Sequence, residues 1–200
     1  MSKVGRGALA ILILVIAAPT AQASTITFGD IRITTALAGD AIDVDVTNAA
    51  GGTDYGLFGD SGGNRAFGFN VIAPDDHVTI SDLTPGFSYA GAGVTDFGGG
   101  LGDFDYVIDG PQSPNDAALP LHFRVTRDGG FTTDADLYEA NALGNVFGAH
   151  IKELDGGRGG FIGATVNTPG EVAAVPEPVS LVLFGTGLAV VAARSRRGKP

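Results

Sequence analysis

The chain has 200 residues, a formal net charge of −10 and no cysteine. The absence of cysteine excludes disulfide bonds, thiol catalysis and cysteine-ligated metals. Half of the 12 basic residues lie in the two end segments, so the middle of the chain is more acidic than the total charge shows. An acidic surface repels nucleic acid and anionic lipid, and we expect no nucleic-acid partner.

The first 23 residues are typical of a secretory signal peptide. Two basic residues precede an uninterrupted apolar run over residues 8–18. The small residues Ala21 and Ala23, placed just before Ser24, form a small-x-small cleavage site. We therefore predict a signal peptide at residues 1–23, export through the secretory translocon, and cleavage between Ala23 and Ser24. The alternative is an N-terminal anchor that stays uncleaved.

Residues 24–170 have the length of one exported domain and a strand-like pattern. In residues 41–48, Ile42, Val44 and Val46 alternate with polar residues, which predicts a strand with one buried face. Similar stretches between Gly- and Asp-rich turns are residues 25–28, 31–35, 66–72, 77–83, 104–109, 121–126, 146–154 and 161–167. About eight or nine such strands predict an all-β fold, an antiparallel β-sandwich.

One short helix is expected within residues 133–143. Thr133 or Asp134 would cap its first turn, because both side chains accept hydrogen bonds from free backbone N–H groups. The residues expected to face the core are Leu137, Tyr138, Ala140 and Leu143.

A Gly-rich loop at residues 98–102 is flanked by carboxylates. Asp96 precedes the loop, and Asp103 and Asp105 follow it. Calcium prefers several hard oxygen ligands from carboxylates and backbone carbonyls, so Asp96, Asp103 and Asp105 are candidate calcium ligands. Their spacing is not that of an EF-hand. We expect no cofactor, with the acidic residues providing solubility, and calcium at these residues is the alternative.

No catalytic motif stands out in the chain. There is no Gly-x-Ser-x-Gly elbow, no lysine-bearing phosphate loop, and no pair of glutamates that is singled out by position. A zinc site from His77, His122 and His150 would require the fold to bring distant residues together. We therefore expect a protein that is not an enzyme and has no catalytic residue. The alternative is a secreted hydrolase that acts on matrix polysaccharide.

The C-terminal end combines a linker, an apolar run and a basic end. Residues 171–178 form the linker, which stays extended because Pro176 and Pro178 prevent a helix from running through it. Residues 179–193 carry no charge and predict a single transmembrane helix, which at about 1.5 Å per residue is shorter than the roughly 30 Å hydrocarbon core. The basic residues 194–200 are expected on the cytoplasmic side of the inner membrane. A plain anchor and a processing signal both fit this pattern.

In this order, these C-terminal residues resemble the PEP-CTERM sorting signal of Gram-negative bacteria. The residues that carry the resemblance are Val175, Pro176, Glu177, Pro178, Ser180, Gly185, Gly187, Arg194, Arg196 and Arg197. The resemblance implies that an exosortase, a membrane-embedded transpeptidase-like enzyme, recognises the motif and removes the tail. It also implies an association with extracellular polysaccharide and biofilm. We therefore expect a structural or adhesive protein of the cell surface, extracellular matrix or medium, with exopolysaccharide or other surface proteins as partners.

The exported domain also resembles, more weakly, the cohesin-type β-sandwich modules that bind other proteins. The stretches that carry this resemblance are residues 66–71, 83–91, 147–151 and 159–163. This second resemblance implies a binding module and names no catalytic residue.

Overall fold

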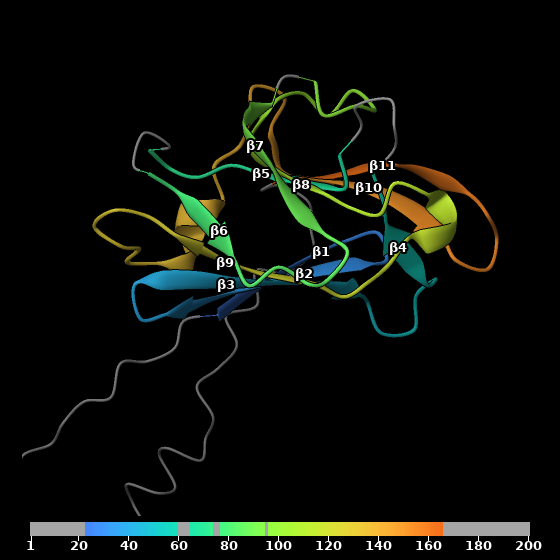
Figure 1. Ribbon diagram of the computed structural model, residues 1–200, viewed down its shortest axis with the longest axis horizontal. Helices are drawn as coiled ribbons and strands as arrows, with labels where there is room; N and C mark the ends of the chain where they lie inside the picture. The colour runs from blue at the N-terminus through green and yellow to red at the C-terminus, as the bar shows by residue number, and fades with distance from the viewer. Residues whose placement is uncertain (1–22, 60–64, 74–76, 95, 166–200) are drawn as a thin grey trace, which may run out of the picture.

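The computed structural model describes residues 23–59, 65–73, 77–94 and 96–165. These residues form two antiparallel sheets that lie over one another (Figure 1), and no α-helix occurs among them. The all-β prediction is therefore confirmed. The predicted linker, transmembrane segment and basic end, and residues 1–22 of the predicted signal peptide, lie outside the described residues.

The first sheet has five strands in the order β1-β2-β3-β9-β6. Their bounds are β1 (Ala23–Phe28), β2 (Ile31–Ala38), β3 (Ala41–Asn48), β9 (Leu121–Thr126) and β6 (Thr79–Ser81). The predicted strands 41–48 and 121–126 coincide with β3 and β9, because both alternate between buried apolar and polar residues. The strand predicted at 77–83 is shorter in the structure.

The second sheet has the order β11-β10-β5-β8-β7, and β4 pairs with β10 beside this path. Its strands are β4 (Tyr55–Leu57), β5 (Phe67–Phe69), β7 (Ser88–Val94), β8 (Phe104–Asp109), β10 (Asn145–Glu153) and β11 (Gly159–Thr165). The prediction of residues 104–109 coincides with β8, whereas the predicted strand 66–72 shortens to β5.

Two strands, β4 and β7, were not predicted. β4 has only three residues, too few to show an alternation. β7 reads Ser-Tyr-Ala-Gly-Ala-Gly-Val, and its pairing with β8 shifts between Tyr89 and Gly91. Gly91 and Gly93 both have positive φ angles, which distort the strand and break the period of two. The described residues therefore contain eleven strands, more than the eight or nine expected.

Phenylalanine rings fill the space between the two sheets. The Phe67 and Phe69 rings of β5 lie 5.9 Å and 5.4 Å from the Phe123 ring of β9, measured between ring centroids. Phe147 of β10 stacks on Phe67 at 5.8 Å. All four rings are fully buried, and burial of each one stabilises the fold by about 1.5–3 kcal/mol. These contacts join the sheets into one sandwich core.

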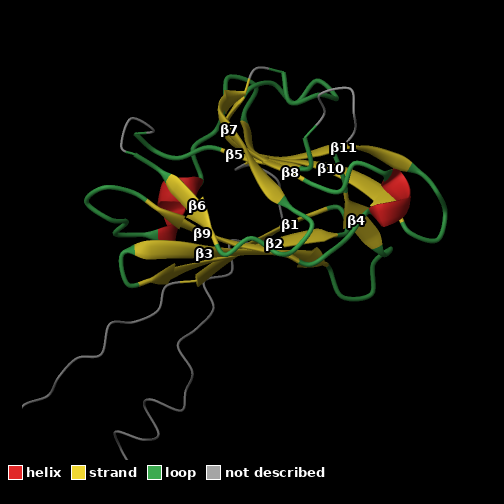
Figure 2. Ribbon diagram, in the orientation of Figure 1, coloured by secondary structure: helices red, strands yellow, loops and turns green. Residues whose placement is uncertain are grey.

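Two short 3-10 turns lie at opposite ends of the sandwich (Figure 2). They are η1 (Pro114–Asp116) and η2 (Asp134–Leu137). The prediction of a helix within 133–143 was therefore too long. Thr133 is the N-cap, with its hydroxyl accepting from the Ala135 N–H over 3.2 Å, and Leu137 is fully buried.

The predicted helix ends early because the chain must turn into β10. Asn141 accepts hydrogen bonds from the backbone N–H groups of Leu143 and Asn145, and Gly144 has a φ of 85°. Both features favour a turn over a continued helix. Ala140 and Leu143 are consequently exposed, which contradicts their expected place in the core.

A row of glycines gives the outer side of the second sheet a second, smaller core. Gly68, Gly148 and Gly163 pair with one another across β5, β10 and β11. A Cβ atom on Gly148 would lie 2.7 Å from the Phe104 ring, so only glycine leaves room for that ring. Phe104 packs with Phe97 and Val107 in this cluster, with Leu101 at its margin. The Gly-rich loop 98–102 is thus fastened to the sheet.

Candidate functional site: an acidic pocket beside the glycine-rich loop

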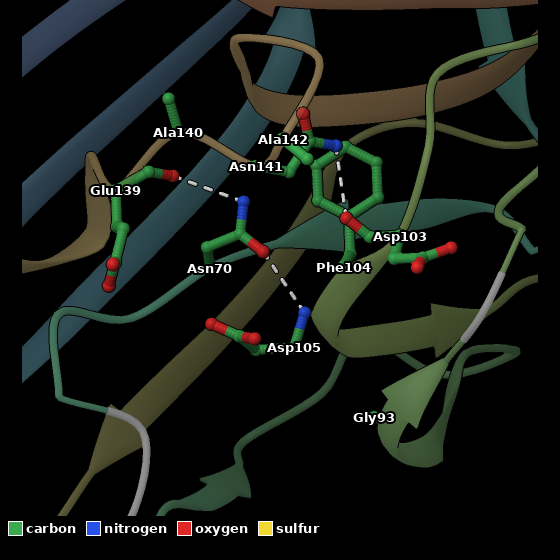
Figure 3. Close-up of a pocket in the computed structure, with 9 residues that line it drawn as sticks. All are labelled: Asn70, Gly93, Asp103, Phe104, Asp105, Glu139, Ala140, Asn141 and Ala142. Atoms are coloured by element: carbon green, nitrogen blue, oxygen red, sulfur yellow. Dashed lines mark hydrogen bonds between the residues drawn. The ribbon is translucent and has the colours of Figure 1, made fainter.

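A pocket of about 310 Å³ lies where the chain enters β8, facing the segment that follows η2. Its lining combines carboxylates, amides and small residues (Figure 3): Asn70, Gly93, Asp103, Phe104, Asp105, Glu139, Ala140, Asn141 and Ala142. Two of the three candidate calcium ligands, Asp103 and Asp105, therefore line one pocket. The third, Asp96, is joined to Asp103, whose Oδ1 accepts a hydrogen bond from the Asp96 backbone N–H over 2.6 Å.

Asn70 holds the centre of the pocket together. Its side-chain nitrogen donates to the backbone oxygens of Glu139 and Asn145, over 3.0 Å and 3.3 Å. Its side-chain oxygen accepts from the Asp105 N–H over 3.0 Å (Figure 3). Asn70 is only 3 % exposed, and these bonds satisfy a polar group that would otherwise be costly to bury. Asn70 thereby connects the end of β5, β8 and the segment after η2.

Asn141 fixes the other wall of the pocket. Its side-chain nitrogen donates to the backbone oxygens of Leu101 and Asp103, over 2.8 Å and 3.0 Å. The Asn145 side chain donates to the same Leu101 oxygen over 2.9 Å. The end of the Gly-rich loop is therefore held by amide side chains.

The three carboxylates of the pocket do not point to a common centre. In Figure 3, the Asp105 and Glu139 carboxylates lie on one side of Asn70, and the Asp103 carboxylate points away from them. Asp105 Oδ2 also accepts from the Val71 N–H over 3.3 Å. Since the amide groups are used within the framework, carboxylate oxygens dominate what the pocket offers a ligand. The pocket can accept hydrogen bonds and attract positive charge.

The candidate metal ligands do not form a cluster in the described part of the chain. Within residues 23–165, apart from the undescribed gaps, no group of three or more His, Cys, Asp or Glu side chains could hold a metal ion. Calcium binding by Asp96, Asp103 and Asp105 stays a prediction. Two of the histidines lie in different surroundings: His122 contacts Asp45 on the first sheet, and His150 is buried between the rings of Phe58 and Phe161.

The residues that sequence reasoning missed are Asn70, Glu139 and Asn141. Asn70 carried a signal, because it is a single amide in the apolar stretch 66–72. Such a residue is buried only with partners. Glu139 and Asn141 carried none, since their contacts with residues 70, 101 and 103 depend on the tertiary fold.

The Asp43–Arg124 ion pair lies outside the pocket, on the outer face of the first sheet. Arg124 Nε and Nη2 donate to the two carboxylate oxygens of Asp43, over 2.7 Å and 2.9 Å. This two-pronged hydrogen bond lowers the pKa of Asp43 below its ordinary value, and partial burial opposes the shift. Asp43 and Asp45 are two of the polar residues that alternate with Ile42, Val44 and Val46, and both pair with residues of β9 across the sheet.

Comparison with known families concerns the C-terminal end. Residues 174–197 match the model of the PEP-CTERM protein-sorting motif. The chain carries a PEP-CTERM sorting motif. This match confirms the resemblance found in residues 175–197, and the PEP-CTERM motif indicates an exported protein that an exosortase-type enzyme processes. The motif itself lies outside the described residues.

No curated protein and no solved structure matches the chain. The expected likeness to cohesin-type modules therefore stays a prediction, although the fold is a two-sheet sandwich as that likeness implies. No helix in the described segments is long and apolar enough to cross a membrane. The predicted transmembrane segment, residues 179–193, lies beyond those segments.

Proposed function

We propose that this protein is a structural or adhesive module of the cell surface or extracellular matrix, delivered by export and exosortase sorting. The observation that carries the proposal is the PEP-CTERM motif at residues 174–197. The sandwich supports it, since the described residues have a continuous core of their own. A domain with its own core can fold on its own and does not need the C-terminal tail once the tail has been removed. Partners of such a module would be exopolysaccharide or other surface proteins.

The intact mass of the protein, recovered from the surface and medium fractions of its host, tests this proposal. The expected mass begins at Ser24 and ends near Pro176–Pro178, without residues 179–200. A full-length tail found only in the membrane fraction would indicate a plain anchor and would contradict sorting.

Substitution of the motif itself gives a second test. A variant with Pro176 and Pro178 both changed to alanine should keep its tail, because the processing enzyme would no longer find its motif. Pro169→Ala is the matched control, since it removes a proline that lies before the matched residues 174–197. Normal processing of the double variant would show that the two prolines are not recognised.

One observation favours the alternative, a secreted hydrolase acting on matrix polysaccharide. Asp103, Asp105 and Glu139 line one pocket, and glycoside hydrolysis needs two carboxylates that face a bound sugar. Release of reducing ends from exopolysaccharide by the purified protein would support this function. Loss of the release in Glu139→Gln, but not in Glu153→Gln outside the pocket lining, would assign it to the pocket.

A further inference from the structure

Buried and half-buried polar side chains lie together where β1, β2 and η2 meet. Thr35 is completely buried, and Asp134 is 3 % exposed. The Thr35 hydroxyl donates to Asp134 Oδ2 over 3.1 Å and lies 2.5 Å from the Tyr138 hydroxyl. Across the β1–β2 pair, Ser24 lies opposite Thr35.

Asp134 has no positive partner among the described residues. The ion pairs between described side chains involve other carboxylates. β1 and β11 carry no charged residue, and Arg32 of β2 is exposed at a position that alternates with the buried Ile31 and Ile33. On η2, Asp136 is already paired with Arg127 at 3.2 Å. Burial of a carboxylate without a counter-charge is costly.

The predicted cleavage between Ala23 and Ser24 creates a new charge at Ser24. Ser24 is the second residue of β1 and pairs with Thr35 of β2. Like the buried Ile26 and Phe28, it lies on the inward face of the strand, because alternate residues share a face. Hydrolysis of the Ala23–Ser24 bond adds one water, leaves a carboxylate on Ala23, and turns the amide nitrogen of Ser24 into an amine that takes up a proton.

We infer that the α-ammonium group of mature Ser24 is the counter-charge of the buried Asp134 carboxylate, so that removal of the signal peptide stabilises the exported domain. The inference rests on the proposed export and on cleavage after Ala23. In the precursor the same nitrogen is a neutral amide, and Asp134 has only hydrogen bonds. Maturation thus adds an attraction that unfolded chains do not have.

The inference gives a defined pH dependence. An unperturbed α-amino group has a pKa near 8, and a nearby carboxylate favours its protonated form. The added stability is therefore complete below about pH 7 and is lost as pH rises through the pKa of the folded state. The titratable groups that contact Thr35, the residue paired with Ser24, are Asp134 and Tyr138. Tyr138 would ionise only at still higher pH, since burial raises its pKa.

Thermal melting of two full-length chains in detergent tests the inference. One chain starts at Ser24 and the other at Ala21, and both end at Pro200. At pH 6.5 the Ser24 chain should melt roughly 3–8 °C higher, and the difference should disappear near pH 10.5. Acetylation of the Ser24 amine should also remove it.

Asp134→Asn provides the decisive comparison, because the amide keeps the hydrogen bond from Thr35 and removes the charge. The difference between the two chains should vanish in this variant and persist in Asp116→Asn, an exposed residue of η1 at the other end of the sandwich. Equal melting of the two chains at pH 6.5, or a difference that survives Asp134→Asn, overturns the pairing. A native N-terminus other than Ser24, read from the exported protein, overturns the predicted maturation. The melting temperatures of the two chains then decide whether the pairing itself exists.

Discussion

At the scale of single residues, the Asp43–Arg124 pair makes a clear prediction about pH. Arg124 lowers the pKa of Asp43, so the pair contributes stability above the unfolded pKa near 4, and this contribution is lost as pH falls through the lower folded pKa. The Arg124 and Asp43 side chains are 40 % and 24 % exposed, so solvent screening keeps the effect small. Asp43→Asn should therefore reduce stability slightly at pH 7 and have less effect near pH 2.

Urea unfolding at both pH values measures this difference. The loss of unfolding free energy in the double variant Asp43→Asn with Arg124→Gln should be no larger than the sum of the losses in the two single variants. Each single change already removes the same ion pair. An equal loss at pH 7 and pH 2 would show that the carboxylate charge does not contribute.

Gly148 is the residue at which an added methyl group should lower the stability of the fold most. In Gly148→Ala, the added Cβ would lie 2.7 Å and 2.9 Å from two carbons of the Phe104 ring. Overpacking of this kind costs about 1–3 kcal/mol. Gly160→Ala on the neighbouring strand is the matched control, since nothing lies within 4 Å of its added methyl group. Equal melting temperatures of the two variants would contradict the proposed role of the glycine row.

At the scale of elements, amide side chains should decide whether the Gly-rich loop keeps its shape. Asn141→Ala removes the hydrogen bonds to the backbone oxygens of Leu101 and Asp103, and those accepted from Leu143 and Asn145. We expect a loss of about 2 kcal/mol in unfolding free energy, from several bonds of roughly 1 kcal/mol that are partly replaced by water. Faster hydrogen exchange should be confined to residues 97–105 and to the amides of Leu143 and Asn145, which lose their acceptor.

Asn115→Ala is the control for this loop. Asn115 is exposed, and its side chain accepts one long hydrogen bond from Lys152, at 3.4 Å. Its replacement should change neither stability nor exchange in residues 97–105. If Asn141→Ala changed stability and exchange in residues 97–105 as little as Asn115→Ala, the loop would be held by the Phe97–Phe104 packing alone.

The elements also show what the sequence could and could not predict. β3, β8 and β9 were predicted with their observed bounds. In β3 and β9 a buried face repeats every second residue, whereas the middle of β8 is buried on both faces. β7 has no such signal, since its glycines and shifted pairing interrupt the alternation. Of the pocket residues, Asp103 and Asp105 were predicted, because they are close in sequence. Glu139 was not predicted, because it comes near them only through Asn70, whose hydrogen bonds join separate segments.

At the scale of the whole molecule, we predict that calcium raises the melting temperature of the exported protein. A cation that binds only the folded state stabilises it by mass action, and the acidic pocket offers carboxylate oxygens. The melting temperature should rise with added calcium and return to its starting value with a chelator. Asp105→Asn should weaken the response, and Asp116→Asn should not. An unchanged melt in both conditions would leave the acidic residues with a role in solubility alone.

The strand order of the first sheet also has a consequence for the time course of secretion. β1, β2 and β3 follow one another along the chain and can pair before the later strands are free to fold. The next strand of that sheet is β9, and the paired residues Asp43 and Arg124 are 81 positions apart. Until β9 arrives, β3 presents a free hydrogen-bonding edge to other chains. Long-range pairing of this kind is slow, so the folding chain passes through a stage in which this edge is open to pairing with other chains.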